Sequence, residues 1–591
     1  MRPKQLLTLT ALCFFIGLTF FLLQSPSEKA ESYPPPTRLN GNETAPAGPP
    51  TAHPIHQLIT EAESEVEKIL SGQSKTLREA VREYKRRYKI PPPPNFDKWY
   101  DFAKAKGVKL IDEYDTIYHS LLPFWALDPS MIRGRAREAL GFDNALIGVL
   151  IRDGRIVNMA GGDEWQRNAT KAMVKDFVKY LPDMDLAFNH HDEPRVIVPH
   201  DDLSRLVQKA LDTAMPAALS QTSPKNAWSP RPIDISDGTR FPEVPITRFN
   251  RFAHQPTWTH SRLSCPPDSP SRSLSQTPQA ALDDLASYTF PPLGFIRNKT
   301  AFSDICLSPS LSSTYGFFDR PNAFDIVHDL FPIFSQSKIS SFQDILYPSP
   351  WYYVDKVPYK SSADYSWSSK ENKMFWRGST TGGFSRDGGW RRQHRQTLVR
   401  KINAKDDAKI LEKNSAAKTW SITSIPRPNF STLFDVKFSH VGQCDDGDCA
   451  AQREFFDIAD GVSTEQMWAY KYLLDIDGNA FSGRFYAFLK SKSLVFKMAV
   501  FREWHEEWIV PWAHYIPFGL RGEEYLESVR YFDRDEEGQQ EAKRVATKSK
   551  EWAEKVLRNE DLEVWFFRLL LEYGRLVDEG RETIGYSMMG I

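Results

Sequence analysis

Two acidic side chains that flank a short apolar run could act as a general base. The segment LPDMDLAFNHHDEP (181–194) places Asp185 at the start of this run and Asp192 after its end. A carboxylate on the turn after a strand can accept a proton from a hydroxyl, and α/β folds expose catalytic groups at such turns. A polar loop is the alternative reading. A metal site made of His190, His191 and Asp192 is disfavoured, because adjacent residues rarely point at one ion.

A glycine- and arginine-rich segment could bind an anionic group. The stretch MFWRGSTTGGFSRDGGWRRQHR (374–395) contains Arg377, Gly378 and Ser379 near its start. Glycines let backbone N–H groups approach an anion, and arginine offers a bidentate fork to phosphate oxygens. The spacing of a Walker A loop is absent. The segment favours a nucleotide diphosphate, with a solvated surface loop as the alternative.

A second loop of similar chemistry follows an apolar strand. In KYLLDIDGNAFSGRF (471–485) the strand ends at an Asp-x-Asp pair, and a small-residue loop then opens a helix. Unpaired N–H groups converge at such a helix start and favour anions. An ordinary βα turn is the alternative, but two such loops together predict a diphosphate clamp. The candidate ligands in this loop are Gly478, Asn479, Ala480, Ser482 and Arg484.

The apolar patterns predict a layered α/β fold that would hold these loops. Residues 144–150 and 154–157 read as a hairpin. Residues 472–476, 483–490 and 493–497 read as strand, helix and strand, which is the order of a βαβ unit. The sequence therefore predicts parallel strands around the second loop.

Length, composition and charge agree with a globular protein. The chain has 591 residues, 41% of them hydrophobic, with 75 basic and 76 acidic side chains. These values exclude a collagen, a disordered charged tail and a polytopic membrane protein. The length predicts two or three domains. The balanced charge provides no general attraction to nucleic acid.

An uncharged apolar run near the start predicts a membrane anchor. Residues 6–23 are close to the length that spans a bilayer as a helix. Arg2 and Lys4 precede the run, so the positive-inside rule places the N-terminus in the cytosol and the body in the lumen or outside. A cleaved signal peptide is the alternative.

Cysteines and glycosylation motifs fit a lumenal body. Cys444 and Cys449 bracket an acidic turn, CDDGDC, where we expect a local disulfide in an oxidising compartment. A zinc site is less favoured, because no second ligand pair is evident. The Asn-x-Ser/Thr motifs lie at Asn42, Asn168, Asn298 and Asn429.

Six stretches between residues 181 and 518 resemble the capsule-associated-protein-like glycosyltransferases of fungi. These are related to the Rumi-type protein O-glucosyltransferases of glycosyltransferase family 90. The stretches follow the family's order and are LPDMDLAFNHHDEPRVIVP, DICLSPSLSSTYGFFDRPNAF, SKISSFQDILYPSPWYY, FWRGSTTGGFSRDGGWRRQHR, KYLLDIDGNAFSGRF and PWAHYIPF. The resemblance implies a GT-B architecture, in which two Rossmann-like domains face a cleft.

The resemblance also implies an inverting transfer of a sugar, glucose or xylose, from a UDP-sugar to a hydroxyl of a glycan, polysaccharide or protein. It makes Asp192 the base, with Asp185 as second choice. Arg377, with Gly378 and Ser379, and the loop that ends at Arg484 would hold the diphosphate. It implies no bound cofactor and no metal, with a divalent ion as the alternative.

The resemblance and the apolar run together predict a single-pass type II protein of the Golgi or endoplasmic reticulum membrane. Its partners would be a UDP-sugar, a glycan, polysaccharide or glycoprotein acceptor and the membrane, and no nucleic acid. The expected parts are a cytosolic tail (1–5), an anchor (6–23), a Pro-rich and helical stem (24–95), an acceptor-side α/β domain (96–335) with a loop-rich insertion (214–280), and a nucleotide-sugar-binding α/β domain with terminal helices (336–591).

Two other functions compete with this hypothesis. One is a catalytically inactive member of the same fold that binds glycans in the lumen. The other is a glycoside hydrolase with two carboxylates. The two arginine-bearing loops disfavour the hydrolase, because hydrolysis needs no diphosphate clamp.

Overall fold

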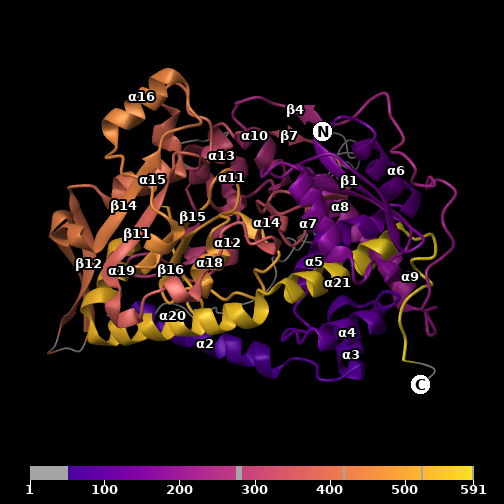
Figure 1. Ribbon diagram of the computed structural model, residues 1–591, viewed down its shortest axis with the longest axis horizontal. Helices are drawn as coiled ribbons and strands as arrows, with labels where there is room; N and C mark the ends of the chain where they lie inside the picture. Colours follow the sequence, from indigo (N-terminus) through magenta and orange to yellow (C-terminus); the bar gives the residue numbers. More distant parts are fainter. Residues whose placement is uncertain (1–50, 274–281, 415, 417–418, 521–522, 589–591) are drawn as a thin grey trace, which may run out of the picture. The chain divides into compact units, whose positions relative to one another are not determined.

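A computed structural model describes residues 51–273, 282–414, 416, 419–520 and 523–588. All of the described residues belong to one compact unit. It is an α/β structure with two five-stranded sheets, seen around β1 and around β15 in Figure 1.

The first sheet is mixed, with strand order β10-β8-β3-β1-β2. β1 runs antiparallel to both of its neighbours, whereas β3, β8 and β10 run parallel. The predicted hairpin is confirmed as β1 and β2, joined at Asp153 and Gly154, whose φ angles of 48° and 68° suit a tight hairpin turn. The strands are β1 (Leu146–Arg152), β2 (Arg155–Ala160), β3 (Met184–Asn189), β8 (Ile333–Ser335) and β10 (Ile345–Leu346).

The second sheet is parallel throughout, with strand order β14-β11-β15-β16-β18. Numbered along the chain, this order is 2-1-3-4-5, so the direction of winding reverses between β11 and β15. The predicted strands at 472–476 and 493–497 are confirmed. The strands are β11 (Glu371–Ser379), β14 (Phe434–His440), β15 (Tyr470–Ile476), β16 (Leu494–Met498) and β18 (Ile516–Pro517).

The remaining elements cover the sheets or form small ribbons. The helix α18 (Phe485–Lys490) confirms the predicted βαβ order. The other strands are β4 (Asn250–Arg251), β5 (Thr289–Phe290), β6 (Phe295–Ile296), β7 (Asp325–Ile326), β9 (Ser337–Lys338), β12 (Asp407–Asn414), β13 (Thr419–Pro426) and β17 (Arg502–Glu503). The helices not introduced elsewhere are α4 (Phe96–Ala105), α5 (Asp115–Leu121), α6 (Pro129–Leu140), α8 (His200–Lys209), α9 (Met215–Leu219), α10 (Trp258–Ser261), α11 (Pro270–Ser273), α12 (Lys299–Phe302), α13 (Gly316–Asp319), α16 (Asp446–Phe455), α17 (Thr464–Met467) and α19 (Glu524–Arg534).

The expected GT-B pair of Rossmann-like domains is not supported. In the described residues only the second sheet has the parallel, doubly wound order. In the first sheet, a two-residue turn joins β1 to β2 and forces them to run antiparallel, because a parallel pair needs a crossover of about a dozen residues or more. The residues that the structure describes also form one unit rather than two.

The expected membrane anchor and the type II location are not supported either. No helix in the described ranges is both long enough and apolar enough to cross a bilayer. The longest ones, α20 (Glu536–Val556) and α21 (Asn559–Val577), carry charged side chains along their length. The run at 6–23, from which the anchor was predicted, lies outside the described residues.

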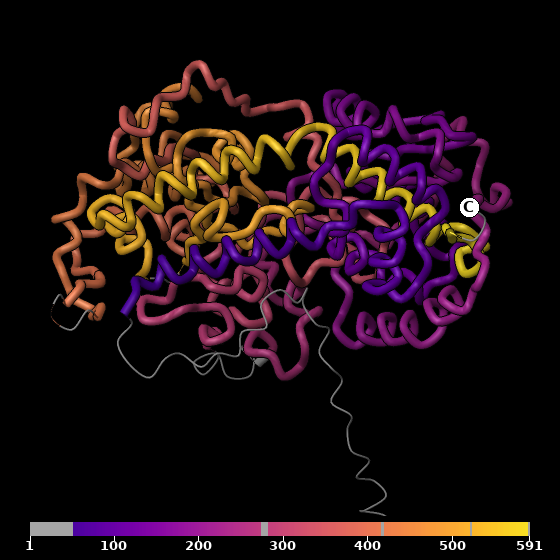
Figure 2. The backbone as a smooth tube through the Cα atoms, turned by 90° about the horizontal axis from the view of Figure 1, so that it is seen from below, coloured from indigo at the N-terminus to yellow at the C-terminus, as the bar shows by residue number. Residues whose placement is uncertain are grey.

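Two helices that the sequence assigned to a stem pack into the folded body. α2 (Pro54–Ser71) lies alongside α20 in Figures 1 and 2. At its start, His53 Nε2 lies 2.9 Å from Glu527 Oε1 in α19, and further along Glu63 forms ion pairs with Arg544 and Lys548 of α20. α2 also buries one apolar face, so burial and charge together fix it to the body.

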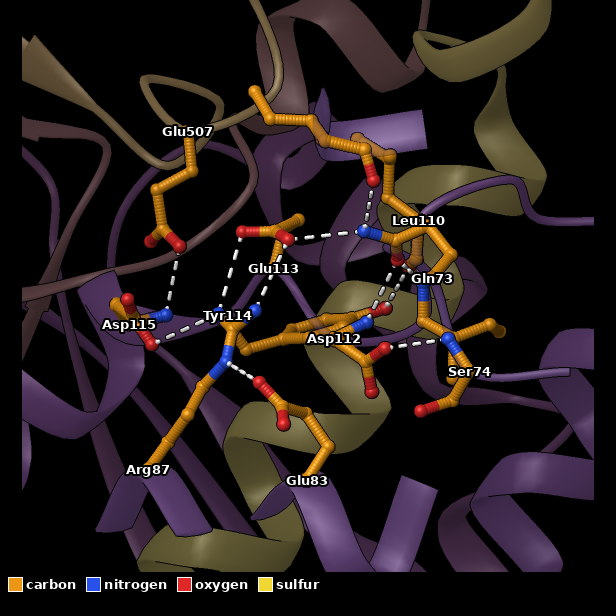
Figure 3. Close-up of polar contacts among 12 residues, drawn as sticks. Gln73, Ser74, Glu83, Arg87, Leu110, Asp112, Glu113, Tyr114, Asp115 and Glu507 are labelled. Carbon is orange, nitrogen blue, oxygen red and sulfur yellow. Dashed lines mark hydrogen bonds and ion pairs between the residues drawn. The ribbon is translucent and has the colours of Figure 1, made fainter. Parts of the chain in front are cut away.

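The second of these helices, α3 (Leu77–Tyr88), is fixed through a polar network (Figure 3). Arg87 forms ion pairs with Glu83 of the same helix and with Glu113 and Asp115 of the following segment. The backbone N–H of Asp115 in turn donates to Glu507 at 2.7 Å. These contacts connect α3 to the segment between β16 and β18 of the second sheet.

Candidate functional site

The two loops predicted to bind an anion lie at the switch point of the parallel sheet. Residues 380–389 follow β11 and residues 477–484 follow β15, so both loops leave from the carboxyl ends of adjacent parallel strands. Ligands of doubly wound sheets bind outside these strand ends, where the winding reverses. The fold therefore places the two candidate loops where a nucleotide site is expected.

Arg395, in the first turn of α15 (His394–Ile402), forms hydrogen bonds at the start of both loops. Its guanidinium donates to the carbonyl oxygens of Ser379 at 3.0 Å, Ile476 at 3.2 Å and Asp477 at 2.8 Å. Burial, with a smaller effect from the charge of Arg484, lowers the pKa of Arg395 to about 10. Sequence analysis did not single out this residue, although it ends the arginine-rich segment. Arg395 is thus a scaffold for both loops rather than a free cation.

Close backbone packing explains the glycines of the first loop. Gly382 has a φ of 109°, and a Cβ there would lie 2.5 Å from the ring of His394. Its N–H donates to the side-chain oxygen of Asn479 in the second loop at 3.1 Å. In β11, just before this loop, a Cβ on Gly378 would lie 2.5 Å from the indole of Trp376. The loops therefore touch through atoms that leave no room for larger side chains.

The predicted disulfide is confirmed beside the first loop. Cys444 and Cys449 are bonded, and the turn that they enclose carries Asp448. Asp448 accepts from the hydroxyl of Ser385 at 2.5 Å and from the N–H of Gly388 at 2.9 Å. A second disulfide joins Cys265 to Cys306.

The two aspartates of the Asp-x-Asp motif at the end of β15 are buried, and both form hydrogen bonds or ion pairs with other residues of the chain. Asp475 pairs with Lys497 at 3.0 Å and accepts from the hydroxyl of Ser482. Asp477 accepts from the hydroxyl of Tyr315 at 2.7 Å and from the N–H of Val500 at 2.8 Å. In the part of the chain that is described, no three His, Cys, Asp or Glu side chains are placed to hold a metal ion. Metal independence stays a prediction.

Replacing Lys497 with methionine should destabilise the protein strongly. Lys497 and Asp475 are both buried, so the substitution leaves a carboxylate with no cationic partner in the interior. Removing one partner of such a pair costs about 3–5 kcal/mol. We expect that loss in the free energy of unfolding measured with urea. Lys373→Met removes a solvent-exposed pair with Glu371 and should cost about 1 kcal/mol or less; equal losses would contradict the prediction.

Arg484 is a positively charged residue of the site whose guanidinium has N–H groups without an acidic partner among the described residues. It lies at the N-cap of α18, and its Nη1 donates to the carbonyl oxygen of Arg377 at 2.6 Å. Its side chain is half-buried, and desolvation lowers its pKa while the charge of Asp475 raises it. Among the described residues, no carboxylate lies within ion-pair distance of it. Its remaining N–H groups can therefore meet an anionic ligand.

Arg377, the other predicted phosphate ligand, already has an anionic partner. Its Nη2 lies 2.7 Å from Asp435 of β14, and its Nη1 donates to the carbonyl oxygen of the same residue at 3.0 Å. The guanidinium also lies 4.9 Å from the ring centre of Phe375, back along the strand. The structure thus brings Arg377 and Arg484 together, but only Arg484 is left unpaired with acid.

The other predicted ligands line the same loops. Ser379 Oγ lies 3.0 Å from the hydroxyl of Thr381. The N–H of Gly478 donates to the carbonyl oxygen of Ala480 at 2.8 Å, which closes the start of the second loop. The carbonyl oxygen of Ser482 accepts from the hydroxyl of Tyr352 at 2.9 Å. These residues shape the loops, and their roles in binding stay predictions.

Asp192 lies just beyond the end of β3, and the residue is exposed. Desolvation by the surrounding protein raises its pKa, and the nearby charges of His191 and His190 oppose that rise. The neighbouring Glu193 is buried; burial and the charge of Asp192 raise the pKa of Glu193 to about 8, and it accepts from the N–H of Ala323 at 3.0 Å. The carboxylate of Asp192 could therefore accept a proton from a bound hydroxyl group.

Asp185, the second-choice base, lies elsewhere. It sits at the amino end of β3 and accepts from Arg152 Nη2 at 2.6 Å. Asn189 lies four positions further along the strand than Asp185, a distance of about 13 Å at the rise of a β-strand. The structure thus separates the two candidate bases and places Asp192 alone at the carboxyl end.

One segment joins the candidate base to the anion loops. The hydroxyl of Tyr315 bonds to Asp477 after β15, and the N–H of Ala323 bonds to Glu193 beside Asp192. Between them, the carbonyl oxygen of Arg320 accepts from the N–H of Phe384 in the first loop. Residues 315–323 therefore contact the surroundings of all three candidate groups.

Comparison with known proteins gives one family and several relatives. Residues 319–580 match the family model described as Glycosyl transferase family 90. The chain is 28% identical over 272 residues to an O-glucosyltransferase rumi homolog of Aedes aegypti, which covers 42% of this chain and 56% of that protein. It is 24% identical over 296 residues to Protein O-glucosyltransferase 1 of Homo sapiens, which covers 46% and 63%. It spans about half the length of the first relatives that it matches.

Proposed function

Because the chain is related to the Rumi-type proteins of glycosyltransferase family 90, chiefly through residues 319–580, we propose that it is a UDP-sugar-dependent glycosyltransferase. The proposed donor sugar is glucose or xylose. The proposed acceptor is a hydroxyl of a protein or glycan, since the relatives are named as protein O-glucosyltransferases.

The observation that carries the proposal is the position of Arg484. It lies at the switch point of a parallel sheet, beside two loops that Arg395 holds together, and it keeps N–H donors without an acidic partner among the described residues. A diphosphate is the anion that a nucleotide site in this position would hold.

In the proposed reaction, Asp192 accepts the proton of the acceptor hydroxyl as its oxygen attacks the anomeric carbon. The new bond joins the acceptor oxygen to that carbon, and the bond between the carbon and the UDP oxygen breaks. UDP leaves with the bonding electrons, and Arg484 stabilises the charge that develops on the diphosphate. Attack opposite to UDP inverts the anomeric configuration.

Release of UDP by the full chain tests the proposal. The protein is incubated with UDP-glucose or UDP-xylose and a panel of glycan and peptide acceptors, with and without EDTA. Acceptor-stimulated UDP release supports the transferase, and its survival in EDTA would support the expected independence of metal. Failure to release UDP or to bind it in a titration would contradict the proposal and favour a glycan-binding protein.

A further inference from the structure

Two half-buried tryptophans lie between the candidate base and the candidate phosphate loop. Trp165 is in the first turn of α7 (Glu164–Val174), and Trp351 is in α14 (Pro350–Tyr353), which lies beside α7 in Figure 1. The ring centres are 6.0 Å apart and the ring planes meet at 77°. Neither residue was singled out from the sequence, because an isolated tryptophan reads as core.

Each indole bonds to a residue that lies near one of the two candidate groups. The indole N–H of Trp165 donates to Asp163 Oδ2 at 3.2 Å, and the other oxygen of Asp163 lies 4.0 Å from Nε2 of His190, two residues before Asp192. The indole N–H of Trp351 donates to the carbonyl oxygen of Gly483, the residue before Arg484, at 3.2 Å. The pair therefore bridges the base side and the phosphate side of the site.

The half-buried ring of Trp165 has the chemistry of a sugar platform. Its N–H is already used, so it presents carbon atoms whose face carries negative charge density. Nζ of Lys356, an exposed residue, lies 4.2 Å from the ring centre, so this face already attracts a positively charged group from a flexible side chain. The C–H groups of a pyranose carry a small positive charge and match such a face. Asp163, whose side chain is 61% exposed, offers an acceptor for sugar hydroxyls beside it.

We propose that Trp165 stacks against a pyranose ring of the acceptor, so that the acceptor class of this protein is a saccharide. The assignment of this sugar to the acceptor rests on the proposed function, because the same stacking chemistry would also suit the sugar of the donor. The acceptor is the better match, since Trp165 lies on the side of the base and Trp351 on the side of the phosphate loop.

The test measures saccharide binding and donor use separately. The full chain is screened on an array of oligosaccharides of defined linkage without nucleotide. The strongest ligand is then titrated against wild type, Trp165→Ala and Trp165→Phe. We expect Trp165→Ala to weaken binding about tenfold or more and Trp165→Phe to weaken it less, because a smaller aromatic face remains. The affinity for UDP-glucose should stay within about twofold.

Trp367→Ala is the matched control. Trp367 is also half-buried and has a lysine, Lys471, 5.4 Å from its ring centre, but it packs near Tyr472 at the amino end of the sheet. This variant should bind the oligosaccharide as wild type does. Unchanged binding by Trp165→Ala would overturn the proposal, as would a wild type that binds no saccharide on the array.

The remaining outcomes separate this proposal from the proposed function. The protein could bind saccharides through Trp165 and yet release no UDP. That result would support the stacking role of Trp165 and contradict the proposed transferase activity. Weaker binding of UDP-glucose by Trp165→Ala, with unchanged oligosaccharide affinity, would assign the ring to the donor and overturn the acceptor assignment.

Discussion

Asp192→Asn should lower kcat for sugar transfer by about 10²–10⁴-fold and leave the affinity for UDP nearly unchanged. That range is the usual contribution of a general base. Asparagine keeps the size of the side chain but cannot accept the proton. Because Asp192 makes no hydrogen bond or ion pair among the described residues, the substitution breaks no structural contact, and the thermal midpoint of unfolding should not fall.

The pH dependence of the wild-type activity should report the ionisation of Asp192. Desolvation by the surrounding protein raises the pKa of Asp192, and the base acts in its ionised form, so kcat/KM should fall as the pH drops through that raised pKa. The acidic limb should therefore lie above the pH expected for an ordinary aspartate. His191→Gln removes a charge that lowers the pKa of Asp192, so this variant should move the limb to higher pH.

Asp185→Asn is the control for both measurements. It makes the same chemical change at the amino end of β3, away from the site, where Asp185 binds Arg152. It should reduce stability, because Arg152 is buried, but kcat per folded molecule and the acidic limb should stay as in wild type. A larger loss of kcat in Asp185→Asn than in Asp192→Asn would make Asp185 the base.

The local parts of the fold could be predicted from the sequence. The hairpin of β1 and β2 and the strands β15 and β16 follow from apolar periodicity over a few residues, and the disulfide between Cys444 and Cys449 follows from spacing. Each of these features depends on neighbours in the chain. The mixed order of the first sheet could not be predicted, because it depends on which distant strands pair.

The partners of the charged side chains could not be predicted either, because they also lie far away in the sequence. The ion pair of Arg377 is with Asp435, 58 residues further along the chain, and Arg395 bonds to carbonyl oxygens of two loops. An arginine with an acidic partner and one without look alike in a sequence. The helix α2 was assigned to a stem because its partners, including Arg544, lie almost five hundred residues away.

Arg484→Ala should be the most damaging change on the phosphate side. A hydrogen bond to a charged group contributes about 1.5–3 kcal/mol, so the dissociation constant of UDP should rise about 10- to 150-fold. Loss of charge stabilisation in the transition state should also lower kcat by about 10²–10³-fold. Calorimetric titration with UDP and steady-state kinetics with UDP-glucose measure the two effects.

Arg484→Lys and Arg377→Ala show which property of Arg484 is responsible. Lysine keeps the positive charge but loses the planar fork, so Arg484→Lys should recover only part of the affinity. Arg377→Ala removes a guanidinium that Asp435 already neutralises, so it should change the affinity for UDP far less than Arg484→Ala does. If the two alanine variants lose equal affinity, the bond between Arg377 and Asp435 must open when the donor binds, and both arginines would then hold the diphosphate.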